Sequence, residues 1–332
     1  MSEILKMTTS ALNAMIHVLN LNEQDAVLVV SDQSTKNVGD AFYRAAIQFG
    51  CPAQLYILPE NKRPLSEIPK EMDELLIGKT IVINVFKGLS DETPFRLKWG
   101  KKVLATNKIR LGHGAGITKS MMIDGSMDID YEMMVNTGHR LIKNFENAKN
   151  VHILAPGGTD IVLCIEDRAF STDTKITKLP YFANLPCGEI WCGPIESKGD
   201  GIIVCDGSIG DLGKIKKPLK IQVKNGKIVD LESDDKELVR NVEKLINLDE
   251  EAKIIGELGI GLNPGAKLRG ILLEDEKALQ TAHIAFGNNE EMDGGQNKSR
   301  THRDFLFYKP TIKVTYKDGS QKTLIRNGNF NF

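Results

Sequence analysis

A histidine and an aspartate two positions apart, His302 and Asp304, are the residues whose type and spacing most directly suggest chemistry. They begin an apolar run that extends to Tyr308 and predicts a strand. Alternate side chains of a strand point to the same face, so His302 and Asp304 would face one way and Arg303 the other. An imidazole beside a carboxylate can bind a divalent cation with two donors. For this pair alone, a simple His–Asp hydrogen bond on a sheet surface is the alternative interpretation.

Three further segments each place an isolated acid or histidine among glycines and small residues. Burying a carboxylate in such surroundings is costly without a counter-charge, and a metal ion would supply one. For either glutamate alone, an exposed strand residue or a turn cap is the alternative. The segments are Gly188-Glu189, Gly256-Glu257-Leu258-Gly259-Ile260-Gly261 and His283-Ile284-Ala285-Phe286-Gly287.

Taken in order along the chain, these motifs resemble those of the M29 metallopeptidases, the aminopeptidase T family. The resemblance covers roughly residues 151–310 by motif and the first half by architecture only. The motifs that carry it are Pro156-Gly157-Gly158-Thr159-Asp160, Gly188-Glu189, Gly256-Glu257, His283-Ile284-Ala285-Phe286-Gly287 and Asn297-x-Ser299-x-x-His302-x-Asp304.

The resemblance implies a metallo-aminopeptidase that hydrolyses N-terminal residues of small peptides. Its centre would hold two divalent ions (zinc, cobalt or manganese) and a bridging water activated for attack. It also implies a homodimer. Among the implied ligands, Glu189 and Glu257 are the expected catalytic residues, and Asn297 and Ser299 would orient His302 or the turn before it. The implied metal ligands are Glu189, Glu257, His283, His302 and Asp304.

Two departures from the family pattern leave other functions open. Glu290 stands where members usually carry a tyrosine, and the chain is shorter than typical members. One alternative is a mononuclear Fe(II) ring-opening dioxygenase similar to the 2,5-dihydroxypyridine dioxygenases, with iron on His283, His302 and Asp304. The presence of both Glu189 and Glu257 favours the two-ion site over this one. Another alternative is a degenerate homologue that binds metal without peptidase activity.

The composition of the 332-residue chain excludes several other classes of protein. The content is 41% hydrophobic and 26% charged, as in ordinary globular proteins, and the formal net charge of −1 argues against a nucleic-acid partner. No apolar run is long enough for a membrane span. The first residues lack the pattern of a secretory signal, and five scattered cysteines fit a reducing compartment. We therefore expect a cytoplasmic protein without membrane or nucleic-acid partners.

The first part of the chain alternates apolar strands with helical segments, which predicts a parallel doubly wound α/β sheet. A first helix is expected to reach about Leu19, and Gly112-His113-Gly114-Ala115-Gly116 is interpreted as a loop that follows no clear strand. The expected strands are 26–31, 53–58 and 80–85. Between them, residues 32–36 are expected to lead into a helix that ends near Gly50, and a second helix is expected around 69–77.

From Val151 onward, short apolar stretches separated by glycine, proline and Asp-Gly or Asn-Gly pairs predict a β-rich α+β domain that holds the metal site. The Asn225-Gly226 pair after 219–224 is a strong hairpin signal, and Asp318-Gly319 repeats it. One helix is expected at about 235–245. The predicted domains are residues 1–147, the α/β domain, and residues 148–332, the metal-binding catalytic domain.

Overall fold

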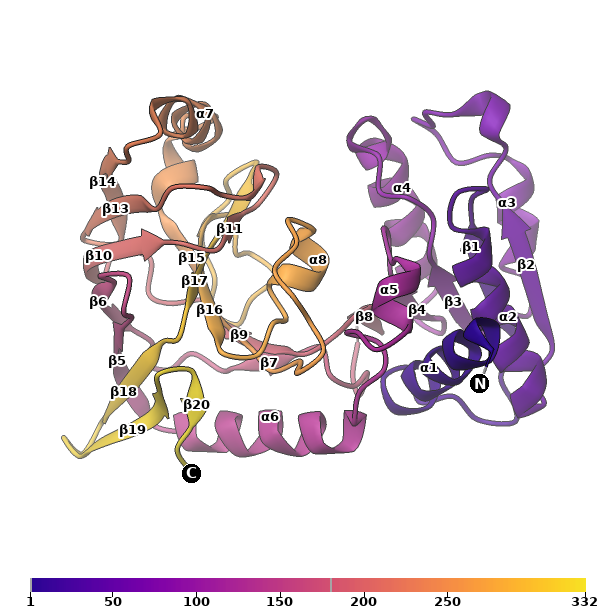
Figure 1. Cartoon of the computed structure of the whole chain (residues 1–332), viewed down its shortest axis with the longest axis horizontal. Coiled ribbons are helices and arrows are strands. Elements are labelled where there is room, and N and C mark those ends of the chain that lie inside the picture. The colour runs from indigo at the N-terminus through magenta and orange to yellow at the C-terminus, as the bar shows by residue number, and fades with distance from the viewer. Residues whose placement is uncertain (1, 180) are drawn as a thin grey trace. The chain divides into compact units, whose positions relative to one another are not determined.

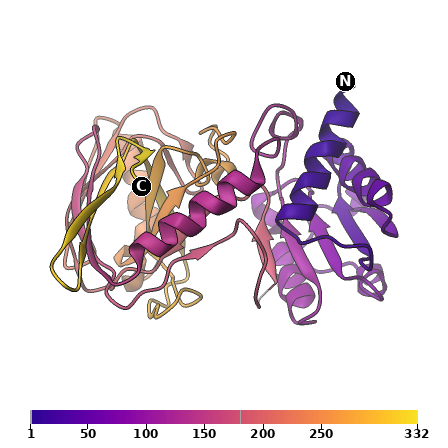
Figure 2. The ribbon, with the colours of Figure 1, turned by 90° about the horizontal axis from the view of Figure 1, so that it is seen from below.

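The apolar strands near the N-terminus form a parallel sheet in the computed structural model, which describes residues 2–179 and 181–332. The chain divides into two compact units, Met1–Val135 with Asp173–Cys187, and Asn136–Thr172 with Gly188–Phe332. It passes from one to the other within α6 (Tyr131–Phe145), which is one continuous helix (Figure 2). The domain boundary between residues 147 and 148 stays a prediction.

The first unit contains a five-stranded parallel sheet in the order β2-β1-β3-β4-β8 (Figure 1). Its strands are β1 (Val27–Ser31), β2 (Ala53–Ile57), β3 (Ile81–Asn84), β4 (Arg110–His113) and β8 (Phe182–Asn184). Its helices are α1 (Glu3–His17), α2 (Lys36–Phe49), α3 (Glu71–Leu75), α4 (Thr93–Leu104) and α5 (Lys119–Met122), with short 3-10 turns at Glu60–Lys62 and Ser90–Glu92.

Helices cover both faces of this sheet, which explains why its central strands are continuous apolar runs. The face that carries Leu28 and Val82 packs against Met72 of α3 and Trp99 of α4. On the other face α2 lies so close that a Cβ on Gly39 would be 2.7 Å from the Cβ of Ser31. The predicted doubly wound α/β sheet is confirmed.

One local interpretation was wrong, because the glycine-rich segment at 112–116 does follow a strand. Gly112 and His113 belong to β4, which pairs with both β3 and β8. The sequence did not predict this strand because it has only four residues and one of them, Gly112, is a glycine. Gly112 is closely packed, since a Cβ there would lie 3.0 Å from methyl groups of Leu185 and Leu19.

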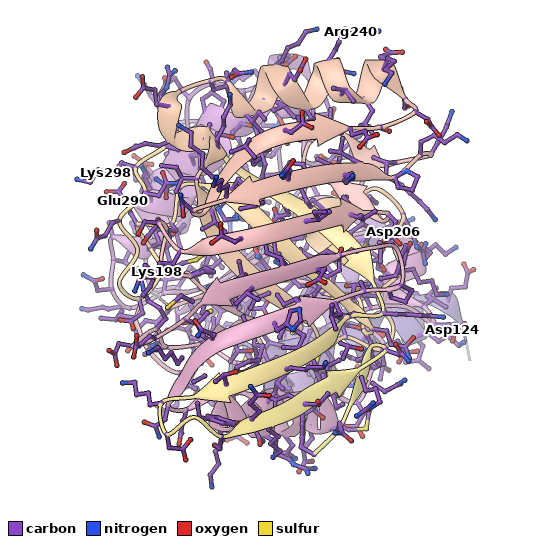
Figure 3. The ribbon with its side chains drawn as sticks, turned by 90° about the vertical axis from the view of Figure 1, so that its left-hand side faces the viewer. Asp124, Lys198, Asp206, Arg240, Glu290 and Lys298 are labelled. Carbon is purple, nitrogen blue, oxygen red and sulfur yellow. The ribbon has the colours of Figure 1, made fainter. Side chains whose placement is uncertain are left out.

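The second unit contains two antiparallel sheets. The eight-stranded sheet, seen face on in Figure 3, has the order β14-β13-β10-β6-β5-β18-β19-β20. Its strands are β5 (Ala148–Leu154), β6 (Asp160–Cys164), β10 (Gly199–Cys205), β13 (Leu219–Lys224), β14 (Lys227–Glu232), β18 (Thr311–Tyr316), β19 (Gln321–Arg326) and β20 (Asn329–Phe330). The Asn225-Gly226 turn joins β13 to β14 with positive φ at both residues, as its sequence predicted.

The seven-stranded sheet has the order β12-β11-β17-β16-β15-β9-β7. All residues of β15 and β16 are buried. Helices α7 (Lys236–Ile246) and α8 (Leu272–Asp275) and a 3-10 turn at Glu250–Lys253 complete this β-rich α+β unit. Its strands are β7 (Ser171–Thr172), β9 (Glu189–Cys192), β11 (Ser208–Ile209), β12 (Gly213–Lys214), β15 (Ile255–Gly261), β16 (Thr281–Gly287) and β17 (His302–Tyr308). Among the helices of the described residues, none is long and apolar enough to span a bilayer.

Candidate metal centre

Four adjacent strands of the seven-stranded sheet, β9, β15, β16 and β17, carry all five residues that were predicted as metal ligands. The register places each of them opposite a glycine or alanine of a neighbouring strand. Small partners leave space above the sheet into which the polar side chains extend. The pairs are Glu189 with Gly261, His283 with Gly259, Glu257 and Asp304 each with Ala285, and His302 with Gly287.

The imidazole of His283 lies at the centre of three carboxylates. Its Nε2 is 3.3 Å from Oε1 of Glu257, 3.6 Å from Oε2 of Glu189 and 3.8 Å from Oδ1 of Asp304. The ring lies directly over β15, because a Cβ on Gly259 would be 2.0 Å from the same Nε2. One nitrogen therefore faces acids that come from three different strands.

The second histidine faces the other oxygen of Glu257. Nε2 of His302 is 3.0 Å from Oε2 of Glu257 and 3.5 Å from Oδ1 of Asp304. Its Nδ1 is 2.7 Å from the backbone carbonyl oxygen of Asn288, to which it can donate. Such a bond fixes the ring so that Nε2 is available as a donor to a metal.

Glu257 belongs to both of two groups of donor atoms. The first is Glu189, Glu257 and His283, and the second is Glu257, His302 and Asp304; within each, the donor atoms lie within 4.8 Å of one another. Because Glu257 directs one oxygen to each histidine, it is the carboxylate whose geometry suits a bridge between two ions. This relationship depends on strand register and was not available from the sequence.

Burial and mutual contact shift the pKa values of these groups strongly. Burial raises the pKa of Glu257, but hydrogen bonds with His283 and His302 outweigh it and hold the pKa well below its usual range. Burial lowers the pKa of His283, yet Glu257 and Asp304 raise it to about 9. His302 is likewise shifted upward by Asp304 and Glu257 against the effect of burial, so its pKa lies well above the usual value.

The donor set fits divalent cations. Three carboxylates and two imidazoles suit zinc, cobalt or manganese, and their concentration in a buried site calls for compensating positive charge. Glu189, Glu257, His283 and Asp304 are each at most 7% exposed. His302 is the partly open member, with 32% of its side chain accessible, so solvent reaches the cluster from its side.

A lysine that the sequence gave no reason to choose is also part of this cluster. Lys277 is fully buried and its Nζ donates to Oε1 of Glu189. It follows Glu274-Asp275-Glu276, and a run of charged residues is ordinarily a solvated surface. No sequence pattern distinguished this run from the exposed ones.

The loop before β17 is braced by the two residues expected to orient it. Asn297 donates from Nδ2 to the carbonyl of Glu251 at 3.0 Å, and Ser299 donates to Oδ1 of Asp249 at 2.8 Å. The link to His302 runs through Asn288, whose Nδ2 donates to the carbonyl of Ser299.

Glu290, which stands where family members usually carry a tyrosine, belongs to neither donor group. It contacts Asn288 instead: its N–H donates to Oδ1 of Asn288 at 3.2 Å, and its Oε2 accepts from Nδ2 of Asn288 at 3.4 Å. Glu290 is exposed in the loop, 3.9 Å from Lys298, and both are labelled at the surface in Figure 3. Tyr308 lies four residues beyond Asp304 on β17, roughly 13 Å along the strand. Its backbone N–H donates to Asp206.

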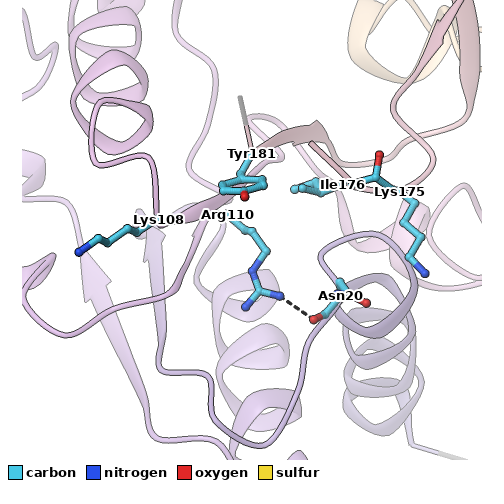
Figure 4. A pocket seen from close by; sticks show the side chains of 7 residues that line it. Asn20, Lys108, Arg110, Lys175, Ile176 and Tyr181 are labelled. Atoms are coloured by element: carbon cyan, nitrogen blue, oxygen red, sulfur yellow. Dashed lines mark hydrogen bonds between the residues drawn. The ribbon is translucent and has the colours of Figure 1, made fainter. Parts of the chain in front are cut away.

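A cavity of about 540 Å³ lies in the first unit, and none of the five predicted ligands lines it. Arg110 is held at its wall by a hydrogen bond to the carbonyl of Asn20 at 2.6 Å (Figure 4) and pairs with Asp25. The sequence did not single out any residue of this cavity. Its lining residues are Asn20, Lys108, Arg110, Lys175, Ile176, Thr177 and Tyr181.

Known proteins resemble the chain in sequence and in fold. Residues 130–330 match the family described as thermophilic metalloprotease (M29). Aminopeptidase AmpS of Bacillus subtilis (strain 168) is 23% identical over 272 residues, which are 75% of this chain and 62% of the relative. The chain thus spans about 62% of the length of that curated relative.

Two solved structures share the fold over nearly their whole length. AmpT from Thermus thermophilus has a TM-score of 0.72 at 16% identity, covering 99% of each chain. A 2,5-dihydroxypyridine dioxygenase from Pseudomonas putida KT2440 has a TM-score of 0.73 at 15% identity, covering 100% of this chain and 98% of the other. The fold of a chain whose residues 130–330 match a metalloprotease family is thus shared with a protein named as a dioxygenase, so the fold alone does not define the reaction.

Proposed function

Because the chain belongs to the M29 family of thermophilic metalloproteases, we propose that it is a metal-dependent aminopeptidase that removes N-terminal residues from small peptides. The observation that carries the proposal is the pair of donor groups that share Glu257. A mononuclear site would need only one such group. The similarity to an aminopeptidase from Bacillus subtilis supports the same reaction class.

In this proposal the five clustered residues hold two divalent ions. Glu189 and His283 would hold one ion and His302 and Asp304 the other, with Glu257 a member of both donor groups. Zinc, cobalt or manganese bound there would activate a water molecule and polarise the scissile carbonyl. Glu189 and Glu257 are also the proposed catalytic residues, because their carboxylates are the two that lie nearest to Nε2 of His283, at 3.6 Å and 3.3 Å.

The two histidines of the cluster differ in their exposure to solvent. His283 is buried and only 1% exposed, so it would hold an ion away from solvent. The partly open histidine, His302, marks the side from which a peptide would enter. Asn288 keeps the ring of His302 in one orientation through its carbonyl oxygen.

The test is hydrolysis of aminoacyl-arylamides by protein freed of metal with a chelator and then reloaded. We expect no turnover without metal and recovery with zinc, cobalt or manganese at two ions per chain. Glu189→Ala and Glu257→Ala should each abolish hydrolysis. Metal binding without hydrolysis of any arylamide would instead indicate the degenerate metal-binding homologue.

A mononuclear Fe(II) dioxygenase is the second candidate, favoured by the fold shared with the Pseudomonas putida enzyme. It would use His283, His302 and Asp304. Of these, His283 belongs to the first donor group, and His302 and Asp304 belong to the second. One iron per chain, with oxygen uptake in the presence of 2,5-dihydroxypyridine, would select this function.

We also propose that the protein is a homodimer and that it is located in the cytoplasm. All five cysteines are buried, as expected of packing thiols in a reducing compartment. Sedimentation equilibrium at micromolar concentration measures the assembly directly, and a mass of twice 36.8 kDa is the expected result.

A further inference from the structure

The ammonium group of Lys277 is buried between two carboxylates at the edge of the metal cluster. Its side chain is 0% exposed, and its Nζ pairs with Oε1 of Glu189 and lies 2.8 Å from Oε1 of Glu276. A buried lysine is costly unless it is paired with acids. Both acids are present here, so Lys277 can stay charged and its positive charge acts on the neighbouring metal cluster.

The backbone fixes this lysine against the strand that also carries Glu257. The N–H of Lys277 donates to the carbonyl of Glu274 at 3.1 Å, and its own carbonyl accepts from Asn263 at 2.8 Å. A Cβ on Gly261 would lie 2.9 Å from the carbonyl carbon of Lys277, and Gly261 is the partner of Glu189 in the β15–β9 pair. The lack of a side chain on Gly261 therefore allows the backbone of Lys277 to pack against the strand opposite Glu189.

Glu189 divides its two oxygens between the lysine and the cluster. Oε1 accepts from Lys277, whereas Oε2 is 3.6 Å from Nε2 of His283. Of the two Glu189 oxygens, Oε2 is thus the one directed at His283. The ammonium group of Lys277 already compensates part of the negative charge of this carboxylate. The carboxylates of the second group, Glu257 and Asp304, form ion pairs with His283 and His302 but, among the described residues, with no lysine or arginine.

We propose that Lys277 is a built-in positive charge that makes the two metal subsites unequal. It weakens binding of a divalent cation to the Glu189–Glu257–His283 group through like-charge repulsion and through partial neutralisation of Glu189. The Glu257–His302–Asp304 group binds its ion more tightly. One ion is thus resident and the other exchanges with the medium. This inference rests on the two-ion site of the proposed function.

Direct contact between Lys277 and a substrate does not account for its position. The side chain has no accessible surface, so a peptide reaches the cluster from the side of His302 and not through Lys277. The lysine acts on bound metal through Glu189 and through its charge.

The experiment is a calorimetric titration of metal-free full-length protein with Mn²⁺. It compares the wild type with Lys277→Met, which removes the charge and the hydrogen bond, and Lys277→Gln, which removes the charge but keeps a donor. Lys267→Met is the matched control, because Lys267 is exposed in the loop that precedes α8. Circular dichroism on each variant checks that it is folded.

We expect two classes of site in the wild type, with Kd values that differ by at least about tenfold. Both Lys277 variants should tighten the weaker class by at least about tenfold, while the control matches the wild type. If the variants leave both Kd values unchanged or weaken the second ion, or if only the methionine variant has an effect, the role of Lys277 is wrong. A wild-type protein that binds no manganese, zinc or cobalt would instead overturn the proposed function.

Discussion

Gly259 lies directly opposite His283 in the β15–β16 pair, and the imidazole occupies the space that a side chain on Gly259 would fill. A Cβ at that position would be 2.0 Å from Nε2 and 2.1 Å from Cε1 of the ring. The glycine is therefore part of the site although it offers no donor atom. It allows the ring to lie flat over the strand with Nε2 toward the acids.

Gly259→Ala is expected to displace His283 and to weaken metal binding by about 10- to 100-fold, as loss of an orienting neighbour does. Calorimetric titration with Zn²⁺ measures the effect. Gly100→Ala is the matched control, because Gly100 is on helix α4 with no neighbour within 4 Å of the added Cβ. That control should bind metal normally and change stability by no more than about 1 kcal/mol. Equal metal affinity in Gly259→Ala and the wild type would refute the steric role.

Because Glu257 belongs to both donor groups and Glu189 to only one, replacing them should remove different numbers of metal ions. Glu257→Gln should retain neither ion tightly, because Glu257 belongs to both donor groups, whereas Glu189→Gln should retain one. Elemental analysis after dialysis measures the ions per chain. Glu243→Gln, on the exposed side of α7, should keep both. If the two cluster variants lost the same single ion, Glu257 would not be a bridge.

Asn289 and Glu290 are adjacent in the chain, but replacing Asn289 should destabilise the protein far more than replacing Glu290. Asn289 is 2% exposed; its Nδ2 donates to the carbonyl of Gly256 at 3.2 Å, and its Oδ1 accepts from the N–H of Asn297 at 2.8 Å. Asn289→Ala should therefore destabilise the protein by about 2–3 kcal/mol and weaken metal binding, since the loop is tied to β15 beside Glu257.

Glu290→Ala should change stability by no more than about 0.5 kcal/mol, because Glu290 is exposed. Urea unfolding of the two variants, with and without Zn²⁺, compares them. Similar destabilisation by both substitutions would argue against the buried link.

Asp32 is expected to contribute to the folding stability of the first unit in a way that depends on pH. Burial raises its pKa, but hydrogen bonds from Ser34, the backbone of Lys87, Arg63 and Thr35 outweigh burial and lower the pKa to about 2, from 3.8. The folded pKa is below the unfolded one. The contribution is therefore complete above about pH 4 and is lost as the pH falls toward about 2, with a size of about 2 kcal/mol.

Asp32→Asn should be less stable than the wild type at pH 7, and the difference should shrink between pH 4 and pH 2.5. Urea unfolding of both proteins at several pH values measures it. The metal-site groups are the same in the two proteins, so their titration cancels in the difference. A difference that stays constant over this range would show that Asp32 is not the group responsible.

The family resemblance, carried by the ordered motifs at 156–160, 188–189, 256–257, 283–287 and 297–304, was sufficient to predict which five side chains meet. It could not reveal that Glu257 is shared, since that follows from pairing Gly259 with His283 and Ala285 with Asp304. Lys277 was missed because burial of a lysine leaves no local pattern. The return of β8 to the first sheet was missed because a three-residue strand has too little periodicity.

Anomalous diffraction from crystals of the manganese- or zinc-loaded protein tests the central claim most directly. Two peaks should lie in the cluster, each with a Glu257 oxygen within about 2.0–2.2 Å, one beside His283 and the other beside His302. A single peak held by His283, His302 and Asp304 without Glu257, or peaks outside these strands, would contradict the two-ion site.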